Sequence, residues 1–251
     1  MKAYRRLAMN EGEAMPAHRP YYPSLPAYYR GAEFQIIYFR ADAAAIQQHL
    51  PEPLIADPAG LAAAFSLRVP FCSAYGPYCE VGLRLRCSFR GQMGFYSSHQ
   101  YIDNVAALCA GRERWGGPKA FAGIAIERQG NLIRAQAVQN GIALMSLTST
   151  AVVPAQAGEM IPMTPSYRLK MIPRADGPGA AIKQIITYVA HAAQTDLLLK
   201  GDGMVEMGAS AQDDLTPLNP IAMEGAFFQV VTLVEGYGVI AYDYLAEQVI
   251  A

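Results

Sequence analysis

The stretch EVGLRLRCSFR, residues Glu80–Arg90, has the clearest hydrophobic period in the chain. Apolar residues occupy every second position after the glutamate, and glycine, arginine and serine lie between them. A period of two predicts a half-buried antiparallel β-strand with one apolar and one polar face. Parity places Glu80 on the polar face with Arg84 and Arg86. The simplest interpretation is an acid paired with arginine on a solvated face or a subunit contact.

Further strands are expected on both sides of this stretch. They lie at residues 34–39, 61–70, 95–102, 121–126, 132–138, 142–150, 167–172, 182–190, 203–207 and 227–237, where β-forming or alternating runs end at turn residues. Short helices are expected at 41–50 and 106–111, the second capped by Asp103 or Asn104. This order predicts a mostly β (α+β) fold, an antiparallel barrel that is closed or nearly closed.

The first 31 residues differ in composition from the rest of the chain. Regular structure there is interrupted by four prolines, Pro16, Pro20, Pro23 and Pro26. The same segment is rich in tyrosine, so we expect residues 1–31 to form an arm that packs on its own domain or on a neighbouring subunit. Residues 32–251 are expected to form a single domain, because a chain of 251 residues with 52% hydrophobic residues can bury one large core.

Composition excludes several classes of protein. The net charge is −1 without a basic cluster, which argues against nucleic-acid binding. No apolar run approaches the roughly 20 residues of a membrane span, and the basic start of the chain lacks the apolar stretch of a secretory signal, so we expect a cytoplasmic protein. The four cysteines have no C-x-x-C spacing, the four histidines are scattered, and no phosphate-binding glycine motif occurs. We therefore expect neither a metal nor a cofactor.

A second stretch, GRERWGGPKAFAG at Gly111–Gly123, carries the candidate chemistry. Its lysine, Lys119, follows two glycines and a proline and precedes Ala120 and Phe121, which solvate an ammonium poorly. Burial disfavours the charged form of an amine, and a neutral amine can attack a ketone to form an imine. Once protonated, an imine draws electrons from the adjacent carbon–carbon bond, as decarboxylases and aldolases require. The alternative is a surface lysine in a Gly-Pro turn.

This stretch, with YIDN (Tyr101–Asn104) before it, resembles the lysine-bearing segment of the acetoacetate decarboxylase superfamily. The resemblance continues in the family's order through FRAD…LPEPL (Phe39–Leu54), YCEVG (Tyr78–Gly82), PSYRLKMIP (Pro165–Pro173), PLN (Pro217–Asn219) and YDYL (Tyr242–Leu245). It implies a barrel of that family's type whose interior shelters an imine-forming lysine at Lys119. It also implies a small oxo-acid substrate and a homo-oligomer of four or more subunits.

The resemblance assigns roles to two further residues. Arg40, at the end of an expected strand, matches the arginine that binds the substrate carboxylate, although a solvated arginine is the alternative. Glu80 matches the family's active-site glutamate. That role and the parity of the strand can both hold if Gly82 marks a bulge that redirects the residue before it.

The sequence departs from the family at two positions. The family usually has a second lysine directly after the first, where this chain has Ala120, and a second acid near the position of Phe65. These losses favour a relative that forms the imine but uses it for aldol, dehydration or hydration chemistry on a 2-oxo acid, with Glu80 moving protons. Decarboxylation of acetoacetate or another β-keto acid is the alternative. A second alternative is a non-catalytic barrel that binds a carboxylate or hydrophobic ligand, with Lys119 as an ion-pair donor.

Overall fold

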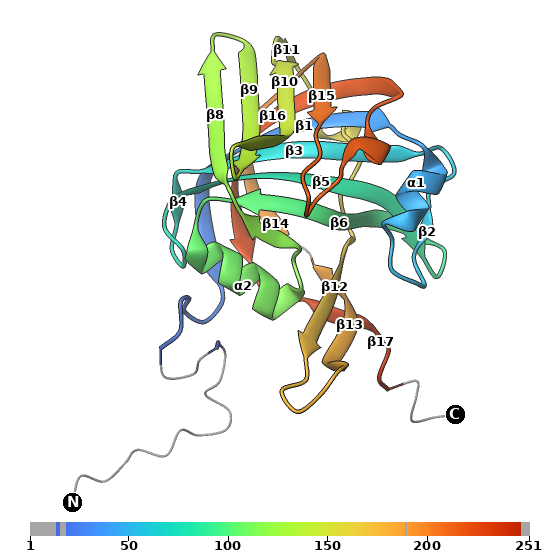
Figure 1. Ribbon diagram of the computed structural model, residues 1–251. Helices are drawn as coiled ribbons and strands as arrows, with labels where there is room; N and C mark the ends of the chain where they lie inside the picture. The colour runs from blue at the N-terminus through green and yellow to red at the C-terminus, as the bar shows by residue number, and fades with distance from the viewer. Residues whose placement is uncertain (1–13, 16–18, 189, 247–251) are drawn as a thin grey trace, which may run out of the picture.

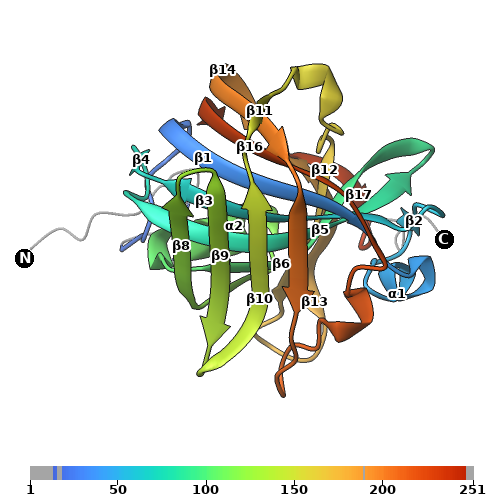
Figure 2. The ribbon, with the colours of Figure 1, turned by 90° about the horizontal axis from the view of Figure 1, so that it is seen from above.

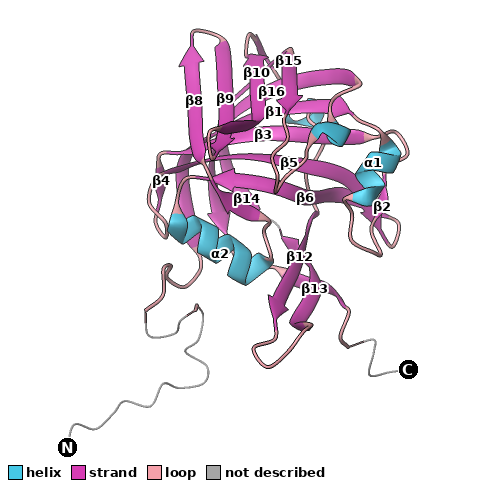
Figure 3. Ribbon diagram, in the orientation of Figure 1, coloured by secondary structure: helices cyan, strands magenta, loops and turns pink. Residues whose placement is uncertain are grey.

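The computed structural model describes residues 14–15, 19–188 and 190–246 (Figure 1). Strands dominate this part of the chain, and the helices are few and short (Figure 3). They are α1 (Ala43–Gln48), α2 (Val105–Trp115) and the 3-10 helices η1 (Ala157–Glu159) and η2 (Thr216–Leu218). The expected mostly β fold with short helices is confirmed. None of the described helices is long and apolar enough to cross a membrane.

Thirteen strands form one large sheet. Its path runs through β11 (Val153–Pro154), β14 (Ala190–Gly201), β16 (Ala222–Glu235), β1 (Ala27–Arg40), β3 (Leu61–Val69), β5 (Tyr78–Phe89), β6 (Gln92–Ile102), β12 (Ser166–Pro173), β13 (Ala180–Tyr188) and β17 (Val239–Asp243). The short strands off this path are β2 (Ile55–Ala56), β4 (Phe71–Cys72) and β7 (Lys119–Phe121). Neighbouring strands are antiparallel except where β6 meets β12 and β7.

The expected closure of the sheet into a barrel is not confirmed. The main sheet begins at β11 and ends at β17, and these end strands do not pair with each other within the described residues. Strands β6 and β12 pair at two positions, Phe95 with Ser166 and Tyr96 with Tyr167. Beyond this short contact β12, β13 and β17 extend away from the rest of the sheet (Figure 1). The sheet is therefore open, because its two end strands do not pair with each other within the described residues.

A second sheet contains β15 (Gly203–Met207), β10 (Ile142–Thr150), β9 (Leu132–Gln139) and β8 (Gly123–Gln129), in that order. Figure 2 shows its strands crossing β1, β3 and β5 of the main sheet. The main hydrophobic core lies between them. Val81 and Leu83 of β5 are fully buried in the same cluster as Ala135 and Leu147 of the second sheet. Burial of a valine or leucine side chain stabilises a fold by about 1.5–3 kcal/mol. The burial of Val81 and Leu83 confirms the apolar face that was predicted for β5.

The opposite face of β5 is also covered. A second buried cluster there contains Phe65 of β3, Tyr78 of β5, and Ala107 and Trp115 of α2. The polar side chains on this face consequently point into the protein. The expectation that Glu80 lies on a solvated face or a subunit contact is wrong, since it is 3% exposed.

Several segments differ from the expected elements. Strands β14 and β17 were not predicted, and neither were the two-residue strands β2, β4 and β11. The residues of β14 mix polar and apolar types without a clear period. The end of the expected arm, from Ala27 onward, already belongs to β1. Much of the arm, residues 1–13 and 16–18, lies outside the described residues. Its described part packs on α2, where the buried Tyr22 donates its hydroxyl hydrogen to Glu113.

Candidate active site

Helix α2 and the turn after it position Lys119. The helix begins where the side-chain oxygen of Asn104 accepts the Ala107 N–H at 2.9 Å, so of the two expected caps Asn104 is the one used. It ends at Gly116, which has the left-handed dihedrals φ 69° and ψ 28°. A β-carbon there would also lie 2.3 Å from the Lys170 Cα. Glycine is therefore required both by the left-handed backbone and by the close approach of β12. The turn leads directly into β7, whose first residue is Lys119.

The lysine side chain runs back across the helix. A β-carbon on Gly111 would lie 2.4 Å from the Cε of Lys119, which means that the lysine stem occupies the space a side chain would need. The backbone is held as well, because Arg112 donates from Nη1 to the Lys119 carbonyl at 2.8 Å. Lys119 is 8% exposed. The surface position that was the alternative for this residue is therefore wrong.

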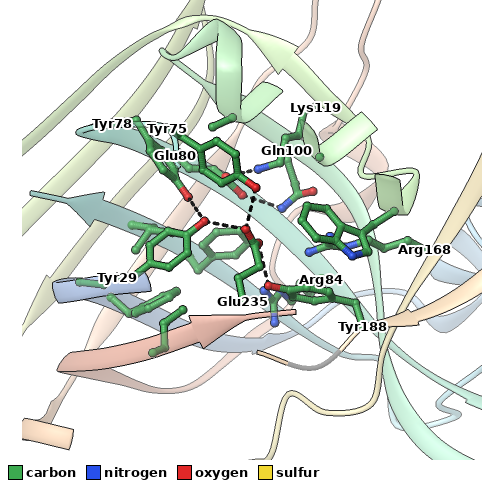
Figure 4. Close-up of a pocket in the computed structure, with 18 residues that line it drawn as sticks. Tyr29, Tyr75, Tyr78, Glu80, Arg84, Gln100, Lys119, Arg168, Tyr188 and Glu235 are labelled. Carbon is green, nitrogen blue, oxygen red and sulfur yellow. Dashed lines mark hydrogen bonds and ion pairs between the residues drawn. The ribbon is translucent and has the colours of Figure 1, made fainter. Parts of the chain in front are cut away.

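The amine of Lys119 meets a carboxylate inside the protein. Its Nζ forms a short ion pair with Oε2 of Glu80 (Figure 4). The other oxygen, Oε1, accepts a hydrogen bond from Nε2 of Gln100 at 2.6 Å. Three adjacent strands supply the three groups: β5 carries Glu80, β6 carries Gln100 and β7 carries Lys119, the last two directly paired. Register between neighbouring strands thus fixes the orientation of the carboxylate toward the amine.

A cavity of about 90 Å³ lies over this pair. Seven of its 18 lining residues are aromatic, and they are Tyr29, Phe34, Phe65, Tyr75, Tyr78, Trp115 and Tyr188. Apolar rings lower the local dielectric constant, which strengthens the electrostatic interactions among the polar groups beside them. Phe65, which stands near the position of the family's second acid, lies in this wall.

Two arginines line the same cavity (Figure 4). Arg84 comes from β5 and its guanidinium lies 5.0 Å from the centre of the Phe65 ring. Arg168 comes from β12, is 5% exposed and lies 4.3 Å from the centre of the Tyr188 ring. The Nε atoms of both arginines are buried without a hydrogen-bond partner. Burial, and next the positive charge of Arg168, lowers the pKa of Arg84 to about 10.

A second carboxylate enters the cavity from β16. Glu235 accepts hydrogen bonds from the hydroxyls of Tyr29 at 2.9 Å, Tyr75 at 3.0 Å and Tyr188 at 2.8 Å. Burial, and next the charge of Glu235, raises the pKa of Tyr75 and of Tyr188, so both hydroxyls keep the hydrogen that they donate. Figure 4 shows this cluster across the cavity from Lys119.

The structure brings Lys119 and Glu80 together but places Arg40 elsewhere. Arg40 forms an ion pair with Glu224, and its Nη1 donates to the Ala59 carbonyl at 2.8 Å. Its side chain is 40% exposed. The cavity is lined by the first half of β1, up to Phe34, and the six residues from there to Arg40 span roughly 20 Å along a strand. The assignment of Arg40 to the substrate carboxylate is therefore not supported by its position.

The bulge at Gly82 that was expected to redirect Glu80 is not observed. Pairing between β3 and β5 is continuous through Gly82, and the register shift between β5 and β6 falls between Leu83 and Arg84. Gly82 serves packing, since a β-carbon there would lie 2.7 Å from the Phe65 ring. Parity correctly placed Glu80 and Arg84 on one face, and that face lines the cavity.

Sequence reasoning missed four polar residues of the cavity, which are Arg84, Gln100, Arg168 and Glu235. A signal existed for Arg84, because it lies four residues after Glu80 in a strand. No local pattern distinguishes Glu235, which reaches the site only through the pairing of β16 with β1. No cluster of residues that could hold a metal ion occurs among the described residues.

The candidate site is therefore a buried lysine–carboxylate pair beside a cavity, on an open and mostly antiparallel sheet. The family model described as "Acetoacetate decarboxylase (ADC)" matches residues 14–245, and the chain belongs to this family. The acetoacetate decarboxylase of Chromobacterium violaceum is 30% identical, covering 93% of this chain and 96% of its own length. That of Ralstonia nicotianae is 27% identical, with coverage of 93% and 96%.

Solved structures show the same fold. Acetoacetate decarboxylase from Legionella pneumophila superposes with a TM-score of 0.85 at 23% identity, covering 97% of this chain and 99% of its own. The enduracididine biosynthesis enzyme MppR, complexed with the condensation product of pyruvate and imidazole 4-carboxaldehyde, superposes with a TM-score of 0.79 at 15% identity. That comparison covers 93% of this chain and 97% of MppR.

Proposed function

We propose that this protein is an imine-forming enzyme that acts on a small oxo-carboxylic acid, with Lys119 as the nucleophile. The observation that carries the proposal is the buried ion pair between Lys119 and Glu80 at a cavity. A structural ion pair does not need a cavity beside it, whereas a reacting amine needs room for a carbonyl compound. Membership of an enzyme family supports the proposal further.

The pair supplies the first and the last proton transfer of imine formation. The Glu80 carboxylate accepts a proton from the Lys119 ammonium, and the neutral amine attacks the substrate carbonyl. One proton of the attacking nitrogen then passes to the former carbonyl oxygen, which gives a neutral carbinolamine. The carbinolamine hydroxyl receives the proton held by Glu80 and leaves as water. The products are a protonated imine, one water molecule and a Glu80 carboxylate, so atoms and charge balance. Gln100 positions Glu80 throughout, because it holds the oxygen that does not contact the amine.

We place aldol, dehydration or hydration chemistry on a 2-oxo acid ahead of decarboxylation. Such reactions need proton transfer at the carbons beyond the imine, and the cavity holds two carboxylates, Glu80 beside the amine and Glu235 across from it. The hydroxyls of Tyr29, Tyr75 and Tyr188 hold the Glu235 carboxylate in place by donating hydrogen bonds to it. Ala120 follows the lysine, so the second ammonium usual in the family is missing from the position beside it.

Decarboxylation of a β-keto acid is the second candidate, and the named activity of the relatives favours it. The Chromobacterium violaceum protein, 30% identical, is an acetoacetate decarboxylase. Both reactions pass through the same imine and differ in which bond then breaks.

Borohydride reduction tests the proposal. We expect pyruvate or acetoacetate plus borohydride to add a reduced adduct to the peptide that contains Lys119, detected by mass spectrometry, and Lys119→Met to abolish it. Lys200→Met is the matched control, because Lys200 forms a similar ion pair with Glu159 at the surface. An adduct elsewhere, or none with any oxo acid tried, contradicts the imine mechanism and returns the protein to a non-catalytic ligand-binding role.

We also keep the predictions of a cytoplasmic homo-oligomer of four or more subunits, with one main domain at 32–251. Light scattering on the purified full chain measures the subunit number. A monomer at micromolar concentration would contradict that prediction.

A further inference from the structure

We propose that Arg84 and Arg168 together bind the carboxylate of the substrate, a position that the sequence resemblance assigned to Arg40. This inference rests on the proposed imine chemistry. It limits the substrates to oxo acids whose carboxylate lies close to the carbonyl that Lys119 attacks.

The first argument is geometric. Aromatic rings hold both guanidinium groups, Phe65 under Arg84 and Tyr188 under Arg168, at 5.0 Å and 4.3 Å from the ring centres. Contact with a ring face fixes the plane of a guanidinium but uses few of its N–H donors. The buried Nε of each arginine has no hydrogen-bond partner. A buried donor without an acceptor is costly, and a carboxylate in the cavity can accept hydrogen bonds from both arginines.

The second argument is the balance of charge around the cavity. The described residues that line it include three cations, Lys119, Arg84 and Arg168, and two carboxylates, Glu80 and Glu235. Glu80 forms an ion pair with Lys119, and Glu235 accepts hydrogen bonds from three tyrosine hydroxyls. One positive charge is therefore left over, and it remains when Lys119 becomes a protonated imine. A substrate with a single carboxylate cancels this charge.

Arg84 also has room beside it to receive an anion. A second cavity of about 540 Å³ adjoins the first and shares Phe65, Arg84 and Tyr188 with it. Its further walls include Ile36, Met160 and Val231, which offer no competing charge. Arg84 thus lines both cavities, and its guanidinium is accessible to an acid in either of them.

The anchor has a consequence for the reaction. Decarboxylation moves the negative charge of the carboxylate into the imine as neutral carbon dioxide leaves. Two arginines hold that charge more strongly in the ground state than in the transition state, which slows the step. In aldol addition, dehydration or hydration the carboxylate keeps its charge, so the same arginines position the substrate without opposing the reaction.

The test compares a charged and a neutral carbonyl compound. Borohydride trapping on Lys119 is titrated with pyruvate and with acetone in the wild-type protein, in Arg84→Met and in Arg168→Met. We expect the pyruvate concentration for half-maximal trapping to rise roughly 10- to 100-fold in each variant, while trapping of acetone is unchanged. Arg174→Met is the matched control, because that arginine forms an exposed ion pair with Asp176.

The outcomes separate the inference from the proposed function. Unchanged half-maximal concentrations for pyruvate would overturn the carboxylate anchor, and so would equal losses with pyruvate and acetone, which indicate a structural role. Failure of the wild-type protein to trap either compound would instead overturn the imine mechanism. If a methionine variant does not fold, the same trapping titrations are carried out with Arg84→Lys and Arg168→Lys. We expect smaller losses from them, again confined to pyruvate, because a point charge replaces a planar two-pronged donor.

Discussion

Gly111 of α2 and Lys119 of β7 lie so close that a β-carbon on the glycine would be 2.4 Å from the lysine Cε. The absence of a side chain at Gly111 is therefore what lets the lysine stem reach the cavity. The helix and the reactive strand are connected by a turn that brings the Gly117 N–H to the Gly111 carbonyl at 2.8 Å, so neither element can move away independently.

We predict from this contact that Gly111→Ala displaces the amine. Alanine favours a helix over glycine by about 1 kcal/mol, so the fold should persist. Trapping of any carbonyl compound on Lys119 should nevertheless fall about 100-fold or more, because a misplacement of about 1 Å is that costly to a reacting group. Gly177→Ala is the control, since a β-carbon at Gly177 meets nothing within 4 Å. Normal trapping in Gly111→Ala would show that the lysine can take another path.

Glu80→Gln tests the proton transfer. The variant keeps the size of the side chain but removes the acceptor for the Lys119 proton, so we expect turnover to fall by about 10²–10⁴-fold. Long incubation with pyruvate and borohydride should still label Lys119, though more slowly. Glu159→Gln is the control, because Glu159 pairs with Lys200 at the surface. Full turnover in Glu80→Gln would leave Glu80 with a positioning role alone.

The surface location of Arg40 gives a third prediction. Its ion pair with Glu224 is 40% and 35% exposed, and such pairs contribute about 0–1 kcal/mol to stability. Arg40→Met should consequently leave the Michaelis constant for an oxo acid unchanged and lower the free energy of unfolding by less than about 1 kcal/mol. If the Michaelis constant instead rose by about an order of magnitude, Arg40 would be restored as a substrate-binding residue.

A fourth prediction concerns acid stability. Burial lowers the pKa of His99 to about 4 from its usual 6.5, and nearby His49 adds to this while Asp213 opposes it. Between these values the unfolded chain binds a proton that the folded protein does not. The folded state therefore loses stability as the pH falls from about 6.5 to about 4, in total on the order of 3 kcal/mol from this residue.

Denaturant unfolding at pH 4 to 7 measures this effect. The free energy of unfolding of His99→Gln should depend less on pH than that of the wild-type protein, because glutamine does not titrate. Parallel curves for the two proteins would contradict the burial of a neutral histidine.

Local patterns in the sequence determined much of the framework. The alternation in Glu80–Arg90 predicted β5 and the shared face of Glu80 and Arg84. This prediction succeeds because the period of a strand depends on neighbouring residues. The same locality explains why β14, whose residues follow no clear period, was missed. The role of Lys119 rested on the family resemblance, because its Gly-Pro turn alone is equally typical of a surface lysine.

Tertiary structure decided which polar side chains share the cavity. Hydropathy assigns the polar face of β5 to solvent, but α2 and β3 cover it and convert that face into the wall of a site. Glu235 joins it because β16 pairs with β1, and Arg168 joins it through the short contact of β12 with β6. Arg40 is excluded because β1 carries it roughly 20 Å beyond the cavity. Such proximities arise from pairing between segments far apart in the chain, so no period or motif within one segment contains them.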